Sequence, residues 1–289
     1  MARLLRSFLF VPGNNKKFID KAKTLNADII CLDLEDSVPM NDKDSARKML
    51  GETLQSRPDF KSEVYVRTNS FESGLAQEDL KAVVQNGING VVIPKVNDAN
   101  EVFELSKLIS DLERTQSIKQ DSVEIMPSIE SAKGVVNAYK IASASPRVSA
   151  LVFGVFDFLF DMGLEYVEDG IEYSYARAKV PVDARAAGVY AIDSIWQKID
   201  DTNGLIKDAT AGMKLGYKGK SIIHPSQIEP VHKIFVPNKE EVEWAKKVVD
   251  TLSDAMNKGK GAVRLEGKMI DAVHYKRAKA LLEVAGEKT

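Results

Sequence analysis

The chain has 289 residues, of which 44% are hydrophobic and 28% charged, and its formal net charge is −2. This is an ordinary globular composition, long enough for one large domain with an appendage. The near-neutral balance argues against a nucleic-acid-binding protein, because such proteins usually carry a basic stripe or patch. The single cysteine, Cys31, excludes an internal disulfide and fits a reducing cytosol.

No stretch of the sequence approaches the roughly 20 apolar residues needed to span a bilayer. The first residues, MARLLRSFLFVPG, share some features with a signal peptide. However, Arg6 interrupts the short apolar core, and no small-residue cleavage site follows it. We therefore predict that this run is a first β-strand and that the protein is cytoplasmic, with no membrane partner.

Short apolar segments alternate with helical stretches along most of the chain. Strands are predicted at residues 7–11, 27–34, 63–68, 90–94, 124–128, 150–153, 190–192 and 220–223. Helices are predicted near residues 15–25, 42–55, 77–85, 100–113, 175–187 and 204–215. Parallel strands buried on both faces give such continuous apolar runs, so we predict an α/β fold, a (β/α)8 TIM barrel, as the catalytic domain over residues 1–237. An open doubly wound sheet is the alternative, but no glycine-rich dinucleotide turn follows the first strand.

Residues 238–289 exceed what a minimal barrel needs. A helix is predicted at 239–257, with an apolar face, and a last helix at 273–283. The KGKG run at 258–261 is typical of a flexible joint. We predict a C-terminal helical extension that acts as a lid, or as an arm that packs on a neighbouring subunit.

Two acidic residues follow apolar runs that lie about one βα unit apart. These are Glu130 in IMPSIESAKG and Asp157 in LVFGVFDFLFDMG. In a barrel, catalytic groups lie at the carboxyl ends of the strands, and neighbouring strands are about 5 Å apart. The pair therefore predicts a hard-cation site, best suited to Mg²⁺, with water and substrate oxygens as the remaining ligands. Further polar residues at predicted strand ends are Asp33, Glu35, Asp36, Arg67, Asn69, Lys95 and His224.

Arg67 follows the strand EVYVRT, and its planar guanidinium suits a carboxylate or a developing enolate oxygen. Glu35 and Asp36 are adjacent, so their side chains diverge. We expect them to orient Arg67 or Lys95 rather than to share one ion. The three histidines show no metal-ligand spacing, which argues against zinc, and no G-x-S-x-G elbow indicates a serine nucleophile.

Several segments occur in an order typical of one family, among them SFLFVPGNNKKFIDKA, ADIICLDLEDSV, VYVRTNS, GVVIPKV, IMPSIESAKGV, LVFGVFDFLFDMG and GKMIDAVHYKRA. From about Arg6 to Leu282, the chain resembles the citrate lyase β-subunit family. That family includes the malyl-CoA and citramalyl-CoA lyases, within a larger aldolase and malate-synthase-like superfamily. The resemblance implies a (β/α)8 barrel, as the strand pattern does.

The resemblance also implies roles for individual residues. It implies that Glu130 and Asp157 bind Mg²⁺, with Mn²⁺ as an alternative, and that Arg67 contacts the thioester carbonyl and enolate oxygen. Asp271 in GKMIDA resembles the family's acid/base carboxylate, which a neighbouring subunit often delivers. A homo-oligomer, a trimer or hexamer, would share the C-terminal arm in this way.

The remaining implied positions concern the substrate. Glu35, Asp36 and Lys95 resemble substrate-binding residues of the same pocket. Lys16 and Lys17 are candidates for binding coenzyme A, as is the loop around Lys220.

The implied function is a Mg²⁺-dependent carbon–carbon lyase. It would cleave or form a 3-hydroxyacyl thioester, such as malyl-CoA, citramalyl-CoA or a citryl thioester, yielding acetyl-CoA and a 2-oxoacid. The first alternative is the β-subunit of a multi-subunit citrate lyase acting on a citryl-acyl-carrier-protein thioester. Further alternatives are an acyl-CoA thioesterase, a non-catalytic scaffold subunit, and a metal-dependent pyruvate aldolase that acts without coenzyme A. Such aldolases typically use a histidine near the second strand, where this chain has DLEDSVPM.

Overall fold

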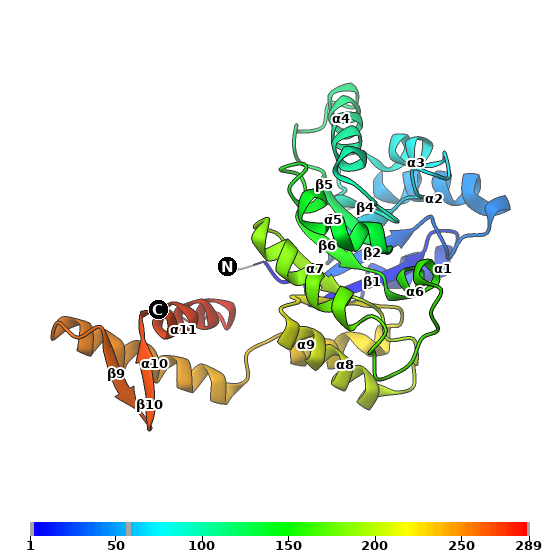
Figure 1. Cartoon of the computed structure of the whole chain (residues 1–289). Helices are drawn as coiled ribbons and strands as arrows, with labels where there is room; N and C mark the ends of the chain where they lie inside the picture. Colours follow the sequence, from blue (N-terminus) through cyan, green and yellow to red (C-terminus); the bar gives the residue numbers. More distant parts are fainter. Residues whose placement is uncertain (1–2, 56–58, 288–289) are drawn as a thin grey trace. The chain divides into compact units, whose positions relative to one another are not determined.

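Figure 1 shows the computed structural model of the chain, which describes residues 3–55 and 59–287. The chain divides into two compact units. One is Leu5–His232, and the other consists mainly of the residues from Lys233 onward. Among the described residues, no helix is both long enough and apolar enough to cross a membrane.

The first unit is a closed barrel of parallel strands, which confirms the predicted (β/α)8 architecture. Each strand pairs with the next along the chain, and β1 pairs with β8 to close the ring. Within the described residues the strands are β1 Ser7–Pro12, β2 Ile29–Asp33, β3 Glu63–Arg67, β4 Gly90–Ile93, β5 Glu124–Ile129, β6 Ala150–Phe153, β7 Tyr190–Asp193 and β8 Gly219–Ile222.

Helices connect successive strands on the outside of the barrel, and a further helix follows β8 (Figure 1). They are α1 Lys16–Ala22, α2 Lys43–Gln55, α3 Ala76–Val83, α4 Ala99–Thr115, α5 Ala132–Ala142, α6 Val155–Met162, α7 Ser174–Ala186, α8 Thr202–Leu215 and α9 Ile228–Ile234. Short 3₁₀ turns at Met40–Asp42 and Pro225–Gln227 precede α2 and α9.

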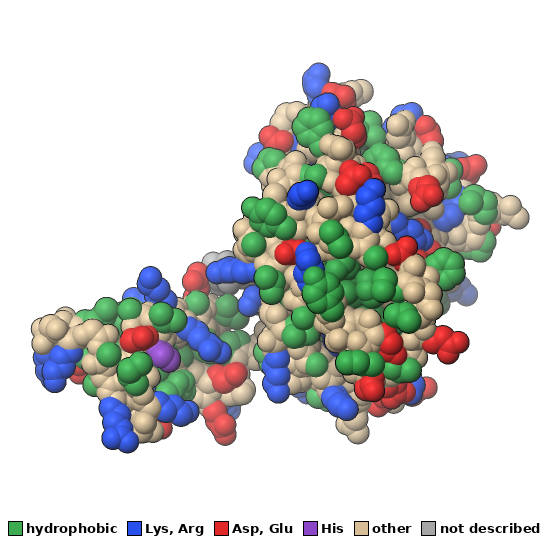
Figure 2. Space-filling view, viewed as in Figure 1, with side chains coloured by type: hydrophobic (Ala, Val, Ile, Leu, Met, Phe, Trp, Pro, Cys, Tyr) green, Lys and Arg blue, Asp and Glu red, His purple; other side chains and the backbone are tan. Residues whose placement is uncertain are grey.

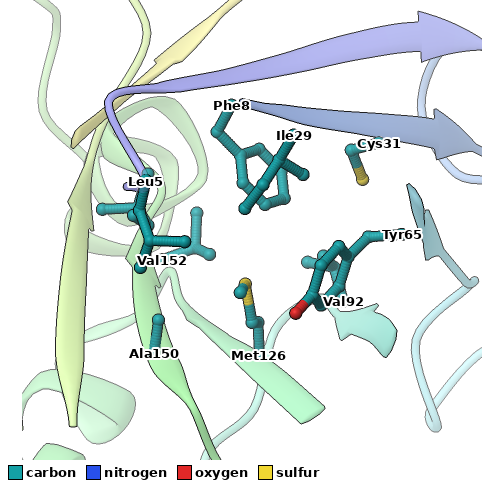
Figure 3. Close-up of a cluster of buried hydrophobic side chains, with 10 residues drawn as sticks. Leu5, Phe8, Ile29, Cys31, Tyr65, Val92, Met126, Ala150 and Val152 are labelled. Atoms are coloured by element: carbon teal, nitrogen blue, oxygen red, sulfur yellow. The ribbon is translucent and has the colours of Figure 1, made fainter. Parts of the chain in front are cut away.

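Side chains from most of the strands fill the barrel interior (Figure 3). Phe8, Ile29, Tyr65, Val92 and Met126 are fully buried there, one from each of the first five strands. Such a packed interior closes the barrel below its rim. Polar chemistry is therefore confined to the residues at the carboxyl ends of the strands.

The second unit contains two helices and a hairpin: α10 Lys239–Asn257, β9 Ala262–Leu265, β10 Lys268–Asp271 and α11 Ala272–Val284. Apolar residues of α10 and α11 pack together, among them Val248, Leu252 and Leu282. The hairpin was not predicted. Its two-residue turn, Glu266-Gly267, has both φ angles positive, 46° and 83°, as a type I′ turn requires.

The structure departs from the sequence prediction after β6. The strand itself, Ala150–Phe153, has the predicted bounds, but helix α6 begins at Val155. Asp157 therefore lies in the first turn of a helix rather than just past a strand. Helices α5 and α9 were likewise not among the predicted elements.

A buried ion pair joins α4 to the loop before β6. Glu113 accepts hydrogen bonds from Arg147 at 2.9 and 2.6 Å, and from the backbone amides of Ser122 and Val123 at 3.1 and 2.9 Å. Burial alone would raise the pKa of Glu113, but these hydrogen bonds outweigh burial and hold it below its usual range. Both side chains are almost completely buried, and the other carboxylate near Arg147, that of Asp121 at 3.0 Å, is exposed to solvent. Loss of Glu113 would therefore leave the buried guanidinium poorly compensated.

We expect the substitution Glu113→Gln to lower the free energy of unfolding by about 3 kcal/mol, because it leaves the buried Arg147 charge with only the exposed carboxylate of Asp121 as a partner. The matched control is Asp111→Asn on the same helix, where an exposed carboxylate pairs with an exposed Arg114. That change should shift stability by no more than about 0.5 kcal/mol. Urea unfolding measures both values, and equal effects would contradict the structural role of Glu113.

Candidate active site

A pocket of about 450 Å³ opens among residues at the carboxyl ends of the barrel strands. Its lining brings together charged residues from segments far apart in sequence, including Asp33, Arg67, Glu130 and Asp157. This is the rim where barrel enzymes carry their chemistry.

Arg67, the last residue of β3, is fixed by a carboxylate that ends the neighbouring strand. Its Nε and Nη2 donate to the two oxygens of Asp33, each at 2.7 Å, and the guanidinium lies 4.8 Å from the ring centre of Phe10. Asp33 also accepts from the backbone amides of Glu35 and Ser37. Burial alone would raise the pKa of Asp33, but the Arg67 charge and these hydrogen bonds hold it below its usual range. Arg67 is therefore a preorganised cation at the pocket wall.

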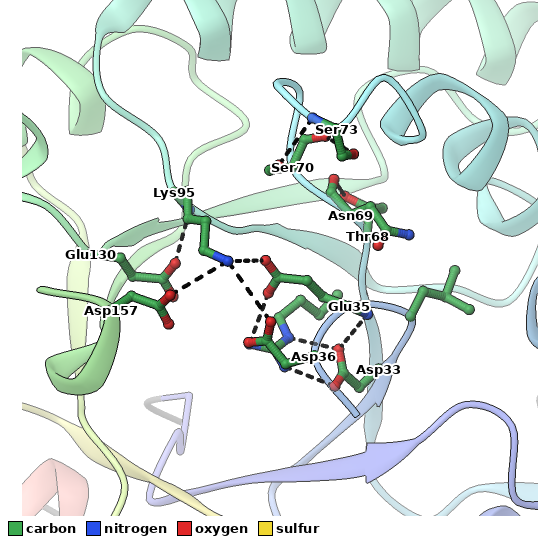
Figure 4. Close-up of polar contacts among 12 residues, drawn as sticks. Asp33, Glu35, Asp36, Thr68, Asn69, Ser70, Ser73, Lys95, Glu130 and Asp157 are labelled. Carbon is green, nitrogen blue, oxygen red and sulfur yellow. Dashed lines mark hydrogen bonds and ion pairs between the residues drawn. The ribbon is translucent and has the colours of Figure 1, made fainter. Parts of the chain in front are cut away.

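Glu35 and Asp36 extend from the loop after β2 toward two cations, as Figure 4 shows. Glu35 lies 3.0 Å from Nη1 of Arg67, and it accepts from Nζ of Lys95 at 2.9 Å. Asp36 is more distant, 3.4 Å from Arg67 and 3.8 Å from Lys95. Glu35 and Asp36 therefore lie within ion-pair distance of both Arg67 and Lys95, as expected from the sequence.

Lys95 follows β4 in a backbone conformation that is unusual for a lysine. Its φ is 57°, in the left-handed region. This conformation lets its amide donate to Oε2 of Glu130 at 2.9 Å, while its ammonium lies 3.4 Å from Asp157 (Figure 4). Burial alone would lower the pKa of Lys95, but the carboxylates around it, Glu35 first, raise it, so the side chain stays charged.

Glu130 comes directly after β5 and is buried against the start of the next βα unit. A Cβ on Gly154 would lie 2.5 Å from Cγ of Glu130, so only glycine fits there. Burial and the negative charges of Glu35 and Asp157 raise the pKa of Glu130 to about 8. Asp157, from α6, is partly exposed on the same pocket.

The charges of this rim do not balance. Asp33, Glu35, Asp36, Glu130 and Asp157 are five carboxylates, and the nearby cations are Arg67, Lys95 and the buried ammonium of Lys43 behind the loop after β2. Two negative charges therefore remain when all of these groups are ionised. A bound divalent cation would offset that excess.

The donor set also fits a hard cation. Within residues 3–55 and 59–287, no three His, Cys, Asp or Glu side chains converge as a complete metal site. Mg²⁺ nevertheless commonly binds to proteins through only one or two carboxylates, because water and substrate oxygens supply its other ligands. Two carboxylates beside an open pocket fit this kind of site. The assignment of Glu130 and Asp157 as metal ligands stays a prediction.

The other predicted site residues lie elsewhere in the fold. Asp271 belongs to the second unit, where it caps α11 and accepts from Nδ1 of His274 at 2.8 Å. That hydrogen bond lowers the pKa of Asp271. Lys16 and Lys17 are exposed at the start of α1. Lys220 is fully buried in β8, where its ammonium pairs with carboxylates.

Two features of the site were not recognised from the sequence. The sequence places Asp33 at a strand end, together with Glu35 and Asp36. No feature of the sequence identifies which of these three acids is the main partner of Arg67. The close approach of Gly154 to Glu130 was also not foreseen, although a lone glycine inside an apolar run is a signal of such contact.

We predict that Mg²⁺ binding to this site strengthens with pH up to about 8. With no metal bound, Glu130 holds a proton below its raised pKa, and a cation must displace that proton. Affinity should rise roughly tenfold per pH unit between pH 6 and 8 and then level off. Calorimetric Mg²⁺ titrations in buffers of different ionisation enthalpy measure the affinity and the released proton. A flat profile would contradict the prediction, whereas Glu130→Gln should remove the pH dependence.

Comparison with known proteins agrees with this geometry. Residues 6–225 match the HpcH/HpaI aldolase/citrate lyase family. The chain is 38% identical over 283 residues to citrate lyase subunit beta of Leuconostoc mesenteroides subsp. cremoris, covering 98% of this chain and 94% of that one. It is 33% identical over 290 residues to mitochondrial citramalyl-CoA lyase of Homo sapiens, covering 97% and 85%.

A solved structure also resembles the chain over nearly its whole length. This is protein CitE of Mycobacterium tuberculosis in complex with magnesium, acetoacetate and coenzyme A, with a TM-score of 0.81, 28% identity and 98% coverage of both chains. The family match spans well over half of the chain, and both sequence relatives exceed 30% identity. The chain therefore belongs to the HpcH/HpaI aldolase/citrate lyase family, as its sequence motifs predicted.

Proposed function

We propose that this chain is a Mg²⁺-dependent carbon–carbon lyase. It would cleave or form a 3-hydroxyacyl thioester that carries a free carboxylate, such as malyl-CoA, citramalyl-CoA or a citryl thioester. The products of cleavage would be an acetyl thioester and a 2-oxoacid. One observation carries the proposal: the carboxylates of Glu130 and Asp157 share a pocket with a guanidinium, Arg67, that Asp33 holds rigid.

Cleavage of such a thioester develops negative charge at two places. The 3-hydroxyl group releases its proton to solvent in the open pocket and becomes the carbonyl of the oxoacid. The electrons of the broken carbon–carbon bond pass to the thioester as an enolate, which then takes up a proton at its α-carbon. When bound, Mg²⁺ supplies Lewis-acid polarisation of the oxoacid oxygens. In this proposal Glu130 and Asp157 would hold the cation, and the ion pair of Lys95 and Glu35 would lie beside it, with the Lys95 ammonium 3.4 Å from Asp157.

Arg67 is suited to stabilise the enolate oxygen. Its Nε and Nη2 are occupied by Asp33. The guanidinium therefore cannot rotate freely, and it meets the developing charge without reorganising. Both oxygens of Asp33 accept hydrogen bonds from Arg67 and from backbone amides, so in this proposal Asp33 positions Arg67.

Asp271 is proposed to transfer the proton at the α-carbon of the acetyl thioester. Its lowered pKa keeps it ionised at neutral pH, so it acts as a base in condensation. By microscopic reversibility, the protonated Asp271 would donate the proton to the α-carbon of the enolate in the cleavage direction. The proposal includes a homo-oligomer in which the C-terminal unit of one chain brings its Asp271 to the pocket of another chain's barrel.

An exposed apolar surface on the barrel supports association. Figure 2 shows hydrophobic side chains gathered over the face formed by α5, α6 and α7. Val136, Tyr139, Phe160, Tyr175 and Val182 on these helices are all substantially exposed. Patches of this kind commonly mark protein contacts, here with further copies of this chain.

Removal of either proposed metal ligand should abolish Mg²⁺-dependent cleavage. We expect Asp157→Asn and Glu130→Gln to lower kcat/KM at least a hundredfold while the chain still unfolds cooperatively, because two carboxylates are the only protein ligands proposed. Asp161→Asn on the same helix is the matched control and should retain activity, since Asp161 accepts from the backbone amide of Ala132 rather than lining the pocket. Full activity of either ligand variant in EDTA would refute the metal assignment.

The role of Asp271 can be tested with little disturbance to the fold. Asparagine caps helices as well as aspartate does, so Asp271→Asn keeps the start of α11 but loses the base. We expect kcat to fall at least a hundredfold with KM nearly unchanged. The same substitution at Asp201, which caps α8, is the control and should leave kcat unaltered. Wild-type turnover by Asp271→Asn would remove Asp271 from the mechanism.

The citrate lyase β-subunit role is the second candidate, favoured by the 38% identity to such a subunit. Assays of the purified chain on malyl-CoA, citramalyl-CoA and a citryl-carrier-protein thioester distinguish the two. A free lyase turns over a coenzyme A thioester alone, whereas a complex subunit needs the carrier. Release of free coenzyme A in place of acetyl-CoA would indicate a thioesterase instead.

A further inference from the structure

Helix α6, which carries Asp157, begins without a side-chain cap of its own. Its N-cap residue is Gly154, which has no side chain to accept a hydrogen bond from the first turn. The usual capping residues are excluded at this position, because any Cβ would meet the side chain of Glu130 at 2.5–2.9 Å. Because Glu130 packs against position 154, that position must be glycine, and the helix that carries Asp157 therefore has no N-cap side chain of its own.

A residue from a different strand end supplies the missing acceptor. Oγ of Ser194, directly after β7, accepts a hydrogen bond from the backbone amide of Val155 at 3.2 Å. Val155 is the first residue of α6, two positions before Asp157. Ser194 is buried and also lines the pocket. This hydrogen bond therefore links the end of β7 to the turn that aims Asp157.

Ser194 is itself held by buried charges behind the rim. Nζ of Lys220 donates to the backbone carbonyl of Ser194 at 2.6 Å. The same ammonium pairs with Asp208 at 2.5 Å and with Asp193 at 3.3 Å. Arg177 in turn donates to Asp193 at 2.5 and 3.0 Å. This network joins α7, β7, α8 and β8, so the hydroxyl of Ser194 projects from a rigid support.

We propose that Ser194 is a positioning residue for the metal site, which caps α6 in place of Gly154 and so fixes the carboxylate of Asp157 opposite Glu130. The inference rests on the proposed function, since it assumes that Asp157 binds Mg²⁺. Ser194 acts through the helix and does not itself bind the metal. Residues that orient metal ligands in this way commonly change metal affinity tenfold or more.

The test is Mg²⁺ titration calorimetry on the purified full-length chain, together with thermal unfolding without metal. Ser194→Ala removes the acceptor, and Ser194→Cys keeps the shape but offers only a weak acceptor. Ser149→Ala is the matched control, because the Ser149 hydroxyl, just before β6, is buried without a hydrogen-bond partner among the described residues. We expect Kd for Mg²⁺ to rise roughly five- to tenfold in Ser194→Ala and by a smaller factor in Ser194→Cys. Because loss of a cap also costs stability, the Tm of Ser194→Ala without metal should fall modestly below that of Ser149→Ala, and the Mg²⁺ affinity, which a purely structural role would leave unchanged, decides the test.

The outcomes separate this inference from the proposed function. Wild-type Mg²⁺ affinity in both Ser194 variants would overturn the positioning role while leaving the metal site intact. A lowered Tm with unchanged Mg²⁺ affinity would likewise overturn it, because Ser194 would then serve stability alone. Absence of Mg²⁺ binding in the wild-type chain would overturn the proposed function and this inference with it.

Discussion

The excess of negative charge at the barrel rim is the constraint on which the rest of the site depends. Glu130 is buried beside Glu35 and Asp157, and its pKa of about 8 measures how poorly the protein alone stabilises its charged form. Such a carboxylate is costly for a fold to keep unless a cation compensates it. The lysine and arginine nearby only partly do so, because Arg67 is already engaged by Asp33 and Lys95 by Glu35.

Local backbone features around Glu130 follow from the same constraint. Lys95 adopts a left-handed conformation and places its amide on one oxygen of Glu130. Gly154 leaves space for the side chain on the other side, at the cost of the cap that α6 would otherwise have. Strained or glycine-dependent positions of this kind tend to collect at functional sites. Here both are explained by contact with one buried carboxylate.

The sequence predicted the barrel well because its strands are buried on both faces and therefore form continuous apolar runs. The residues at the strand ends followed from that fold, and Arg67, Glu130 and Lys95 indeed share one rim. The same continuity concealed helix α6, because the residues after Gly154 are as apolar as those of β6. Asp157 was therefore placed at the end of an apolar run rather than in the first turn of a helix. Which of three clustered acids faces Arg67 depends on strand register, and that required the structure. The hairpin of the second unit was not predicted because its turn, Glu266-Gly267, lacks the Asn, Asp or Gly that normally occupies the first position of a type I′ turn.

The central claim is that the rim binds an oxoacid through a divalent cation held by Glu130 and Asp157. Calorimetric titration of pyruvate into the wild-type chain, with Mg²⁺ and again after EDTA treatment, tests it most directly. We expect saturable binding with Mg²⁺ and at least a hundredfold weaker binding without it, because the remaining carboxylates repel an anionic ligand. Equal affinity for pyruvate under both conditions would show that Glu130 and Asp157 do not hold a cation that binds the oxoacid.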